Sequence, residues 1–162
     1  MSSTEQPIST LRSFVHLVLA VAVCFAAAGI GAQFMPGEWY AGLNKPTWNP
    51  PNWIFGPVWT ALYTMMAVSA WLVWCKLDWK GGRDLLMLFG VQLALNAAWS
   101  WLFFGLHRPE LALIDIVALW LAIVATIWSF RPVSQTAAWL LVPYLAWVTF
   151  ATLLNLALWR MN

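Results

Sequence analysis

The chain has 162 residues, of which 62% are hydrophobic and only 9% are charged, with a formal net charge of +2. Soluble domains carry about 25% charged residues, and the mean hydropathy here is +0.73. This composition excludes an ordinary soluble domain, and the small net charge gives no reason to expect a nucleic-acid partner. It predicts an all-α integral membrane protein that crosses the lipid membrane several times.

Five apolar runs are long enough to be membrane helices, because a helix needs about 20 residues to cross a hydrocarbon core of roughly 30 Å. They cover residues 11–34, 55–74, 85–104, 111–130 and 137–159. We interpret the first run as a helix that is retained, since no clear cleavage site follows it. Residues 1–10 are predicted to form a disordered N-terminal tail. Residues 11–162 are predicted to form a single domain, a bundle of five transmembrane helices.

The segment from Trp39 to Trp59 is the only long stretch predicted to be non-helical. It contains four tryptophans, Tyr40 and four prolines. Because proline fixes φ and cannot continue a helix, the segment is expected to be stiff and extended. A stiff aromatic connector is typical of a lid. Two other breaks are expected, a short charged loop at residues 76–84 and a bend at Pro143 within the fifth run.

An odd number of spans places the two termini on opposite sides of the membrane. One face then carries Lys45, Arg108 and Arg160, and the other carries Arg12, Lys76, Lys80, Arg83 and Arg131. Cytoplasmic loops carry an excess of Lys and Arg. The count favours a cytoplasmic location for the second face by five cations to three.

The third span has two different faces. Spacings of four, three and four place Gln92, Asn96, Trp99 and Phe103 on one side. Small residues on the opposite side, among them Gly90 and Ala94, could pack inside the monomer or form a dimer interface. The polar, aromatic side is suited to a cavity; the alternative is that Gln92 and Asn96 only bond neighbouring helices, and for Gln92 this alternative is favoured.

Comparable stripes occur on three other spans, each with one polar or indole group among small and apolar residues. Such a mixture suits an apolar ligand held by a few hydrogen bonds. The alternative is that these tryptophans belong to the core or to an interfacial belt. The stripes are Trp59, Tyr63, Met66 and Ala70 on the second span, Asp115, Leu119, Ala122 and Thr126 on the fourth, and Trp147, Ala151, Leu154 and Leu158 on the fifth.

Asp115 is the one carboxylate well inside a span. An unpaired charge there costs roughly 2.5 to 3.5 kcal/mol on the insertion scale, so a partner is expected, and Lys45 or Arg160 lies on the same side of the membrane. Asp115 could form a structural ion pair or contact a ligand directly. A third possibility is that it serves as the proton site of a small exporter.

No metal-spaced cluster, nucleotide-binding loop or nucleophile triad occurs in the sequence. His16 and His107 are expected at opposite faces of the membrane, so they cannot both ligate one haem iron. Cys24 and Cys75 are interpreted as packing residues rather than a disulfide. We therefore expect no metal and no cofactor.

Several motifs together resemble the TspO/MBR family, the tryptophan-rich sensory proteins related to the mitochondrial translocator protein. They are WYAGLNKPTWNPP at 39–51, GPVW at 56–59, QLALN at 92–96 with Trp99, and PYLAW at 143–147 with Ala151, Thr152 and Asn155. The resemblance extends over nearly all of the chain from about Val15.

The resemblance implies a five-helix bundle, usually a homodimer, with a pocket that binds porphyrins, sterols and synthetic ligands of the benzodiazepine-receptor type. Trp39 and Tyr40 would belong to its lid, and Trp59, Asn96, Trp147 and Ala151 would line it; the stripes add Tyr63, Trp99, Asp115 and Leu154 as candidate ligand-binding residues. The family's cholesterol-recognition motif has a tyrosine where this chain has Leu156, so sterol binding is expected to be weak at most.

Two functions follow from the resemblance. The first is a membrane receptor, sensor or carrier for porphyrins and other hydrophobic small molecules, with a role in tetrapyrrole regulation or stress response. The alternative is an enzyme that degrades protoporphyrin oxidatively in light, in which Trp59 and Trp147 would be the catalytic indoles. A bacterial cell envelope is the expected location, in either the inner or the outer membrane.

Overall fold

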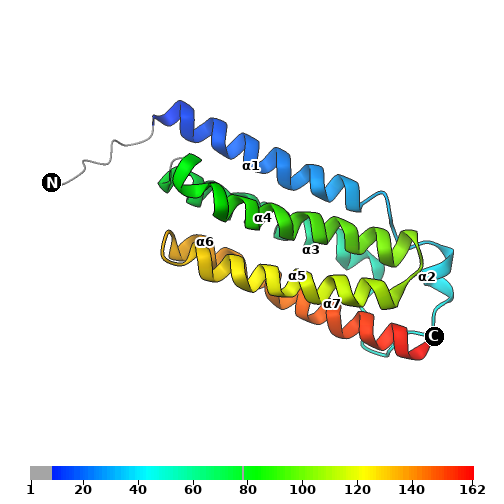
Figure 1. Ribbon diagram of the computed structural model, residues 1–162. Helices are drawn as coiled ribbons and strands as arrows, with labels where there is room; N and C mark the ends of the chain where they lie inside the picture. The colour runs from blue at the N-terminus through cyan, green and yellow to red at the C-terminus, as the bar shows by residue number, and fades with distance from the viewer. Residues whose placement is uncertain (1–8, 78) are drawn as a thin grey trace.

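The computed structural model describes residues 9–77 and 79–162, so the predicted tail lies almost wholly outside the described residues (Figure 1). The first helix begins at Thr10, where the Ser9 hydroxyl accepts from the Arg12 amide. The elements in chain order are α1 (Thr10–Gly31), α2 (Glu38–Gly42), the 3-10 helix η1 (Asn52–Ile54), α3 (Phe55–Lys76), α4 (Trp79–Ser100), the π-helix η2 (Trp101–Gly105), α5 (Pro109–Phe130), α6 (Gln135–Leu140) and α7 (Val142–Met161).

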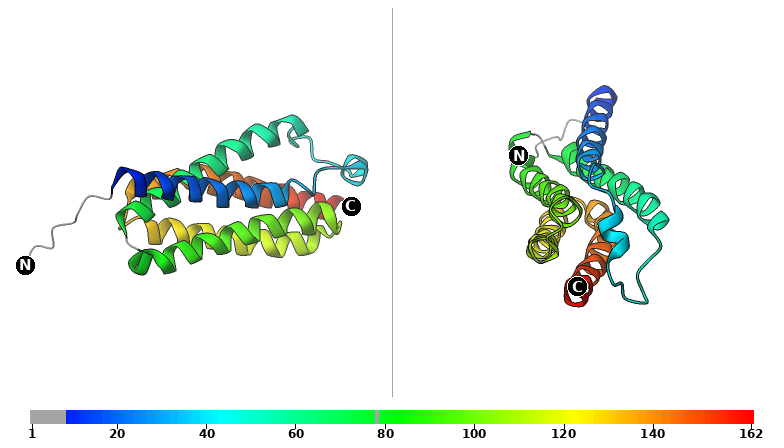
Figure 2. Two further views of the ribbon diagram at one scale, coloured as in Figure 1. Left: turned by 90° about the horizontal axis from the view of Figure 1, so that it is seen from above. Right: turned by 90° about the vertical axis from the view of Figure 1, so that its right-hand side faces the viewer.

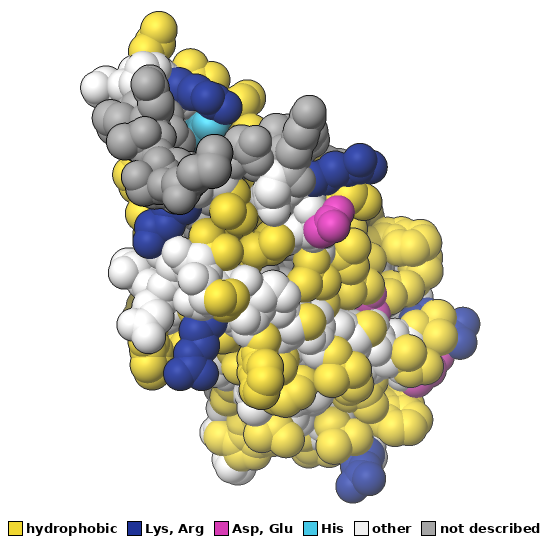
Figure 3. Space-filling view, turned by 60° about the vertical axis from the view of Figure 1, so that its left-hand side comes forward, with side chains coloured by type: hydrophobic (Ala, Val, Ile, Leu, Met, Phe, Trp, Pro, Cys, Tyr) yellow, Lys and Arg dark blue, Asp and Glu magenta, His cyan; other side chains and the backbone are white. Residues whose placement is uncertain are grey.

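Five helical segments of the described chain are long and apolar enough to cross a membrane, which confirms the predicted class of five-helix integral membrane protein. They are Thr10–Gly31, Asn52–Lys76, Gly81–Gly105, Pro109–Phe130 and Gln135–Met161. Their outward surfaces are apolar, and Figure 3 shows hydrophobic side chains over much of the molecule. On α1, for example, Leu11 and Phe14 are 74% and 61% exposed, as expected for side chains that face lipid rather than water.

The structure differs from three expectations about where helices begin, bend or are absent. Helix α4 begins at Trp79, within the expected loop at 76–84, and Gly82 inside it packs against Leu77, where a side chain would meet Cβ at 3.4 Å. The expected bend at Pro143 in the last span is an interruption of one residue at Leu141, between α6 and α7, with Pro143 in the first turn of α7; the whole segment Gln135–Met161 still forms one span. The aromatic connector also contains two short helices, α2 and η1.

The membrane helices run alternately up and down, and the two termini lie at opposite ends of the bundle (Figure 1). The start of α1 shares its end with the turn between α5 and α6, whereas α2 and the last residues of α7 lie at the other end. This arrangement agrees with the predicted topology. Seen from above, the first half of α3 diverges from α1, while their other halves approach each other (Figure 2).

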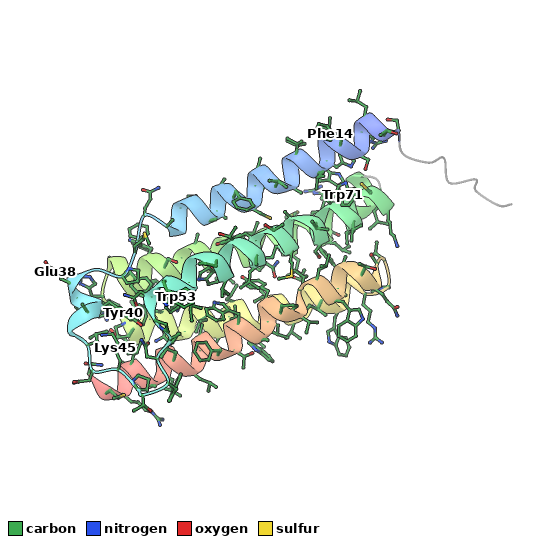
Figure 4. All side chains as sticks on the ribbon, turned by 180° about the vertical axis from the view of Figure 1, so that it is seen from behind. Phe14, Glu38, Tyr40, Lys45, Trp53 and Trp71 are labelled. Atoms are coloured by element: carbon green, nitrogen blue, oxygen red, sulfur yellow. The ribbon has the colours of Figure 1, made fainter. Side chains whose placement is uncertain are left out.

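Some polar groups of the described core are bonded between helices, whereas the Gln92 amide, which could have bonded a neighbouring helix, is buried with no such bond. Trp71 Nε1 donates to the Ser13 carbonyl at 3.0 Å, which joins α3 to α1 near Phe14 (Figure 4). Ser69 Oγ donates to the Ala137 carbonyl at 2.8 Å, which joins α3 to α6. Such bonds matter because lipid offers no alternative hydrogen-bond partner. These bonds hold α3 to α1 and α6 at the end of the bundle where α1 begins. The helices diverge at the other end, near α2.

Candidate functional site

A cavity of about 450 Å³ lies between the helices at the end of the bundle that carries α2. All five membrane-spanning segments contribute to its wall. Aromatic and small residues predominate in the lining, which comprises Phe25, Ala28, Gly29, Gly31, Ala32, Phe34, Met35, Pro36, Phe55, Gly56, Trp59, Thr60, Tyr63, Asn96, Trp99, Ser100, Phe104, Ile116, Leu119, Trp147, Val148 and Ala151. The volume is within the range of roughly 300 to 1,000 Å³ typical of small-molecule sites.

Six of the ten predicted ligand-binding residues line this cavity, namely Trp59, Tyr63, Asn96, Trp99, Trp147 and Ala151. Tyr40 and Leu154 line a smaller adjoining cavity of about 30 Å³, which shares Trp99, Trp147 and Ala151 with the larger one. Trp39 and Asp115 line neither of these two cavities. The structure therefore brings together residues that lie on four different segments of the sequence.

Asn96 is the most deeply buried polar residue of the wall, at 3% exposure. Its Nδ2 donates to the hydroxyl of Tyr144 on α7 at 2.8 Å. This bond holds the amide in place between α4 and α7. Within the part of the chain that the structure describes, Asn96 Oδ1 has no protein donor, so it can accept a hydrogen bond from a ligand.

The three tryptophans of the wall differ in how their indole N–H groups are used. Trp99 Nε1 donates to Asn155 Oδ1 at 3.0 Å, so this indole is fixed to α7. Among the described residues, the Nε1 atoms of Trp59 and Trp147 have no protein acceptor. Both are therefore free to donate to a ligand, and their rings offer apolar faces as well.

Neighbouring aromatic rings support these walls. The Trp59 ring lies 5.7 Å from Tyr63 and 6.3 Å from Tyr144, and the Trp147 ring lies 5.9 Å from Phe55. These centroid distances are typical of tilted and edge-to-face packing. These ring contacts join the α3 and α7 sides of the cavity wall.

The cavity is not closed on the side between α1 and α3. Gly29 on α1 and Gly56 and Thr60 on α3 belong to its lining and are exposed. A Cβ atom added at either glycine would meet nothing within 4 Å. This side coincides with the divergence of α1 and α3 in Figure 2, and it faces the membrane rather than the aqueous phase.

The α1–α3 connection, residues 32–54, caps the end of the bundle. Tyr40 is buried, and its hydroxyl donates to Asn49 Oδ1 at 2.9 Å. Lys45 lies beside it, with Nζ 4.9 Å from the centroid of the Tyr40 ring (Figure 4). Burial raises the pKa of the Tyr40 phenol above its ordinary value, and the bond to Asn49 opposes part of that shift. At neutral pH the phenol is therefore a donor.

Trp39 packs against the bundle end rather than the cavity. Its ring stacks on His107 at 4.4 Å and meets Phe103 edge-on at 5.7 Å. His107 has a positive φ of 56° in the turn before α5, and His16 stacks on Trp74 near the opposite end. The two histidines are thus far apart along the bundle. No group of three or more His, Cys, Asp or Glu residues is close enough to hold a metal within the described chain.

The expectation that Asp115 pairs with Lys45 or Arg160 was wrong. Lys45 Nζ instead donates to the carbonyls of Ala41 and Leu43, at 3.0 and 3.1 Å. In the described part of the chain Asp115 has no ion-pair partner, and its Oδ2 is buried without a hydrogen bond. Asp115 was predicted to line the cavity, but the next residue, Ile116, lines it instead.

Sequence reasoning missed the contribution of α1. Phe25 on α1 and Phe34 just after it line the cavity, but the middle of α1 is apolar on every side, so no stripe distinguishes the face that meets the cavity. A signal does exist in the small residues from Ala26 to Ala32, because small residues mark places where membrane helices approach closely. Four of them, Ala28, Gly29, Gly31 and Ala32, line the cavity next to its open side between α1 and α3.

The fold and the cavity define a class, that of five-helix membrane proteins with an aromatic-lined cavity beneath the α1–α3 connection. Residues 17–160 match the TspO/MBR family. The chain is 42% identical over 158 residues to the tryptophan-rich protein TspO of Chlorobaculum tepidum, covering 93% of this chain and 98% of that protein. It is 45% identical over 138 residues to the translocator protein of Homo sapiens, covering 82% of each. The tryptophan-rich sensory protein of Cereibacter sphaeroides is 42% identical over 142 residues, covering 88% of each.

The chain therefore belongs to the TspO/MBR family, as the motifs predicted. The names tryptophan-rich sensory protein and translocator protein support a role as a membrane receptor or sensor. Its five apolar helices make it a multi-pass integral membrane protein.

Proposed function

We propose that this protein is a receptor, sensor or carrier that binds porphyrins and other flat apolar molecules in the cavity between its five spans. The observation that carries the proposal is the lining of that cavity. Four aromatic residues from separate elements, Phe34, Trp59, Trp99 and Trp147, surround a single buried amide, Asn96.

The lining supports a flat ligand with few polar groups. Aromatic rings contribute large apolar surfaces that favour stacked or edge-on contact with another ring system. Among the described residues, the polar groups available to a ligand include Asn96 Oδ1, the N–H groups of Trp59 and Trp147, and the hydroxyls of Tyr63 and Ser100, all on a mainly apolar wall. A few polar groups on an apolar wall are typical of a site that orients a hydrophobic ligand.

Quenching of tryptophan fluorescence by protoporphyrin, measured in the dark on the purified protein, tests this proposal. The test variant combines Trp59→Phe, Asn96→Ala and Trp147→Phe. A control variant with Trp101→Phe and Trp159→Phe removes the same number of tryptophans outside the cavity lining. We expect saturable quenching in the wild type and control, and its loss in the test variant. Equal quenching in all three would mean surface or micelle partitioning and would refute the site.

A second function is supported by the presence of Trp59 and Trp147 in the same cavity. If the protein degrades protoporphyrin oxidatively in light, these indoles are the residues that would contact the excited ligand. Illumination of the porphyrin complex should then yield products that Trp59→Phe with Trp147→Phe suppresses, while dark binding persists. Product formation that is unchanged in this variant would leave the binding function alone.

We also propose a homodimer formed through α4, and a bacterial cell envelope as the location. Gly90 and Ala94 are exposed on α4, and the Cβ position of Gly90 faces open space. Small residues allow helices in lipid to approach closely. Gly90→Leu should shift the purified protein to a monomer in light scattering, and a dimer that survives this change would place the interface elsewhere. Weak sterol binding belongs to the same proposal for the cavity and is tested by competition with protoporphyrin.

A further inference from the structure

The opposite end of the bundle carries a surface hollow that has no part in the cavity. It has a volume of about 540 Å³ and lies between the end of α3 and the turn from α5 to α6. Its lining consists of Lys76, Arg131, Pro132, Val133, Ser134 and Gln135. We propose that this hollow binds the phosphate of an anionic phospholipid headgroup.

Both cations of the hollow are available to an anion. Lys76 is exposed, and its Nζ donates to the Val133 carbonyl at 3.2 Å, which holds the ammonium beside the turn. An ammonium has three donors, so two remain. Arg131 is also exposed. Within residues 9–77 and 79–162, neither cation has a carboxylate at ion-pair distance, and the described ion pair, Arg108–Glu110, lies at the other end.

Two exposed tryptophans set the depth of the hollow in the membrane. Trp128 precedes Arg131 by three residues on α5, and Trp139 follows Gln135 by four on α6, so each indole shares a helical face with a residue of the hollow. Trp128 and Trp139 are 76% and 69% exposed. Each lies roughly 4 to 6 Å further into the membrane than its partner, at 1.5 Å per residue.

This order of groups matches a phospholipid. Exposed tryptophans are typical of the boundary between headgroups and acyl chains, so the cations just outside them lie at the level of the phosphates. Basic hollows between spans at the cytoplasmic side bind anionic headgroups. Figure 3 brings this end forward and shows other Lys and Arg side chains spread around it. Arg12, at the start of α1, and Arg83, in the first turns of α4, do not line the hollow.

Native mass spectrometry of the full chain in a neutral detergent tests the proposal. Phosphatidylglycerol and phosphatidylcholine with identical acyl chains are titrated separately, with inorganic phosphate as a third arm. The test variant is Lys76→Gln with Arg131→Gln. The matched control, Arg12→Gln with Arg83→Gln, removes two cations from the same end of the bundle but none from the hollow.

We expect one phosphatidylglycerol to bind first and saturably, at least about tenfold more tightly than phosphatidylcholine, and this preference to fall about tenfold or more in the test variant only. Equal binding of the two lipids would overturn the proposal. An equal loss in both variants would show diffuse attraction instead of a site. Displacement by equimolar inorganic phosphate would show a small-anion site and would also overturn it.

Folding is checked separately, because cations at the C-terminal ends of helices also stabilise the helix dipole. Unfolding midpoints of the test and control variants are compared before the lipid titration. A third variant, Lys76→Arg with Arg131→Lys, retains both charges and should retain the preference for phosphatidylglycerol. Loss of the preference in this variant, with normal folding, would contradict recognition by charge.

Discussion

The Asn155 amide connects three membrane helices at the wall of the cavity. Its Oδ1 accepts from Trp99 Nε1 of α4 at 3.0 Å, and its Nδ2 donates to the Pro109 carbonyl of α5 at 2.8 Å. Asn155 itself lies on α7 and is 1% exposed. Asn155→Leu keeps a similar volume and removes both bonds, so it should destabilise the bundle and release the Trp99 indole.

The loss of stability depends on the two groups that would lose a partner, the Pro109 carbonyl and the Trp99 N–H. Pro109 begins α5, so its carbonyl retains a helical partner four residues on. The Trp99 N–H loses its acceptor, and an unsatisfied buried donor costs about 1 to 3 kcal/mol. Side-chain bonds between membrane helices average about 0.6 kcal/mol and reach about 1.7. Because Trp99 is only half-buried, we expect a loss of about 1 to 1.5 kcal/mol in the free energy of unfolding.

A double-mutant cycle isolates this bond. Unfolding by sodium dodecyl sulfate in mixed micelles is measured for the wild type, Asn155→Leu, Trp99→Phe and the double variant. The coupling free energy should be close to 1 kcal/mol. Protoporphyrin affinity should also fall in Asn155→Leu, since Trp99 forms part of the wall. A coupling indistinguishable from zero would refute the view that the amide fixes the indole.

Three further predictions concern the end of the bundle near α2. Gly105→Ala should lower protoporphyrin affinity several-fold in the quenching titration, because the new Cβ would lie 2.8 Å from Phe34 Cδ1 and displace that ring of the cavity wall. The stabilisation that the neutral Tyr40 phenol gives to the closed α1–α3 connection should be complete below its unfolded pKa of about 10. It should then be lost as pH rises through the higher folded value, and Tyr40→Phe should remove this alkaline step in limited proteolysis. In stopped-flow quenching, Gly56→Leu should slow protoporphyrin association, whereas Asn162→Ala should leave the rate unchanged. Faster association in Asn162→Ala, with no effect of Gly56→Leu, would place the entrance at the connection.

The helical stripes succeeded where polarity varied around a helix. On α4, the spacing of Asn96 and Trp99 placed both on the cavity side, because the 3.6-residue period fixes which residues share a face. On α5 the same reasoning chose the stripe of Asp115 and Leu119, of which Leu119 lines the cavity, whereas Ile116 lines it in place of Asp115. Neighbouring stripes on a helix differ by one residue, and the choice between them depends on how α4 and α7 pack against α5.

Sequence alone also could not reveal the pairing that holds the α1–α3 connection to α7. The backbone N–H of Asn44 donates to Asn162 Oδ1 at 2.9 Å, and Asn162 Nδ2 donates to the backbone carbonyl of Asn44 at 3.1 Å. The two residues are 118 positions apart and neither belongs to a periodic pattern. They become partners only when all five spans are packed, since that brings the end of α7 beneath the connection.

This pairing bears on how a ligand reaches the cavity. A path past the α1–α3 connection must break the two Asn44–Asn162 bonds and the Tyr40–Asn49 bond. A path between α1 and α3 crosses the exposed residues Gly29 and Gly56, at neither of which an added Cβ would meet a neighbouring atom. Hydrophobic molecules also concentrate in lipid, because burial of apolar surface is favourable by about 25 cal/mol per Å². We therefore expect a hydrophobic ligand to enter between the diverging halves of α1 and α3, with the connection staying in place as a cap.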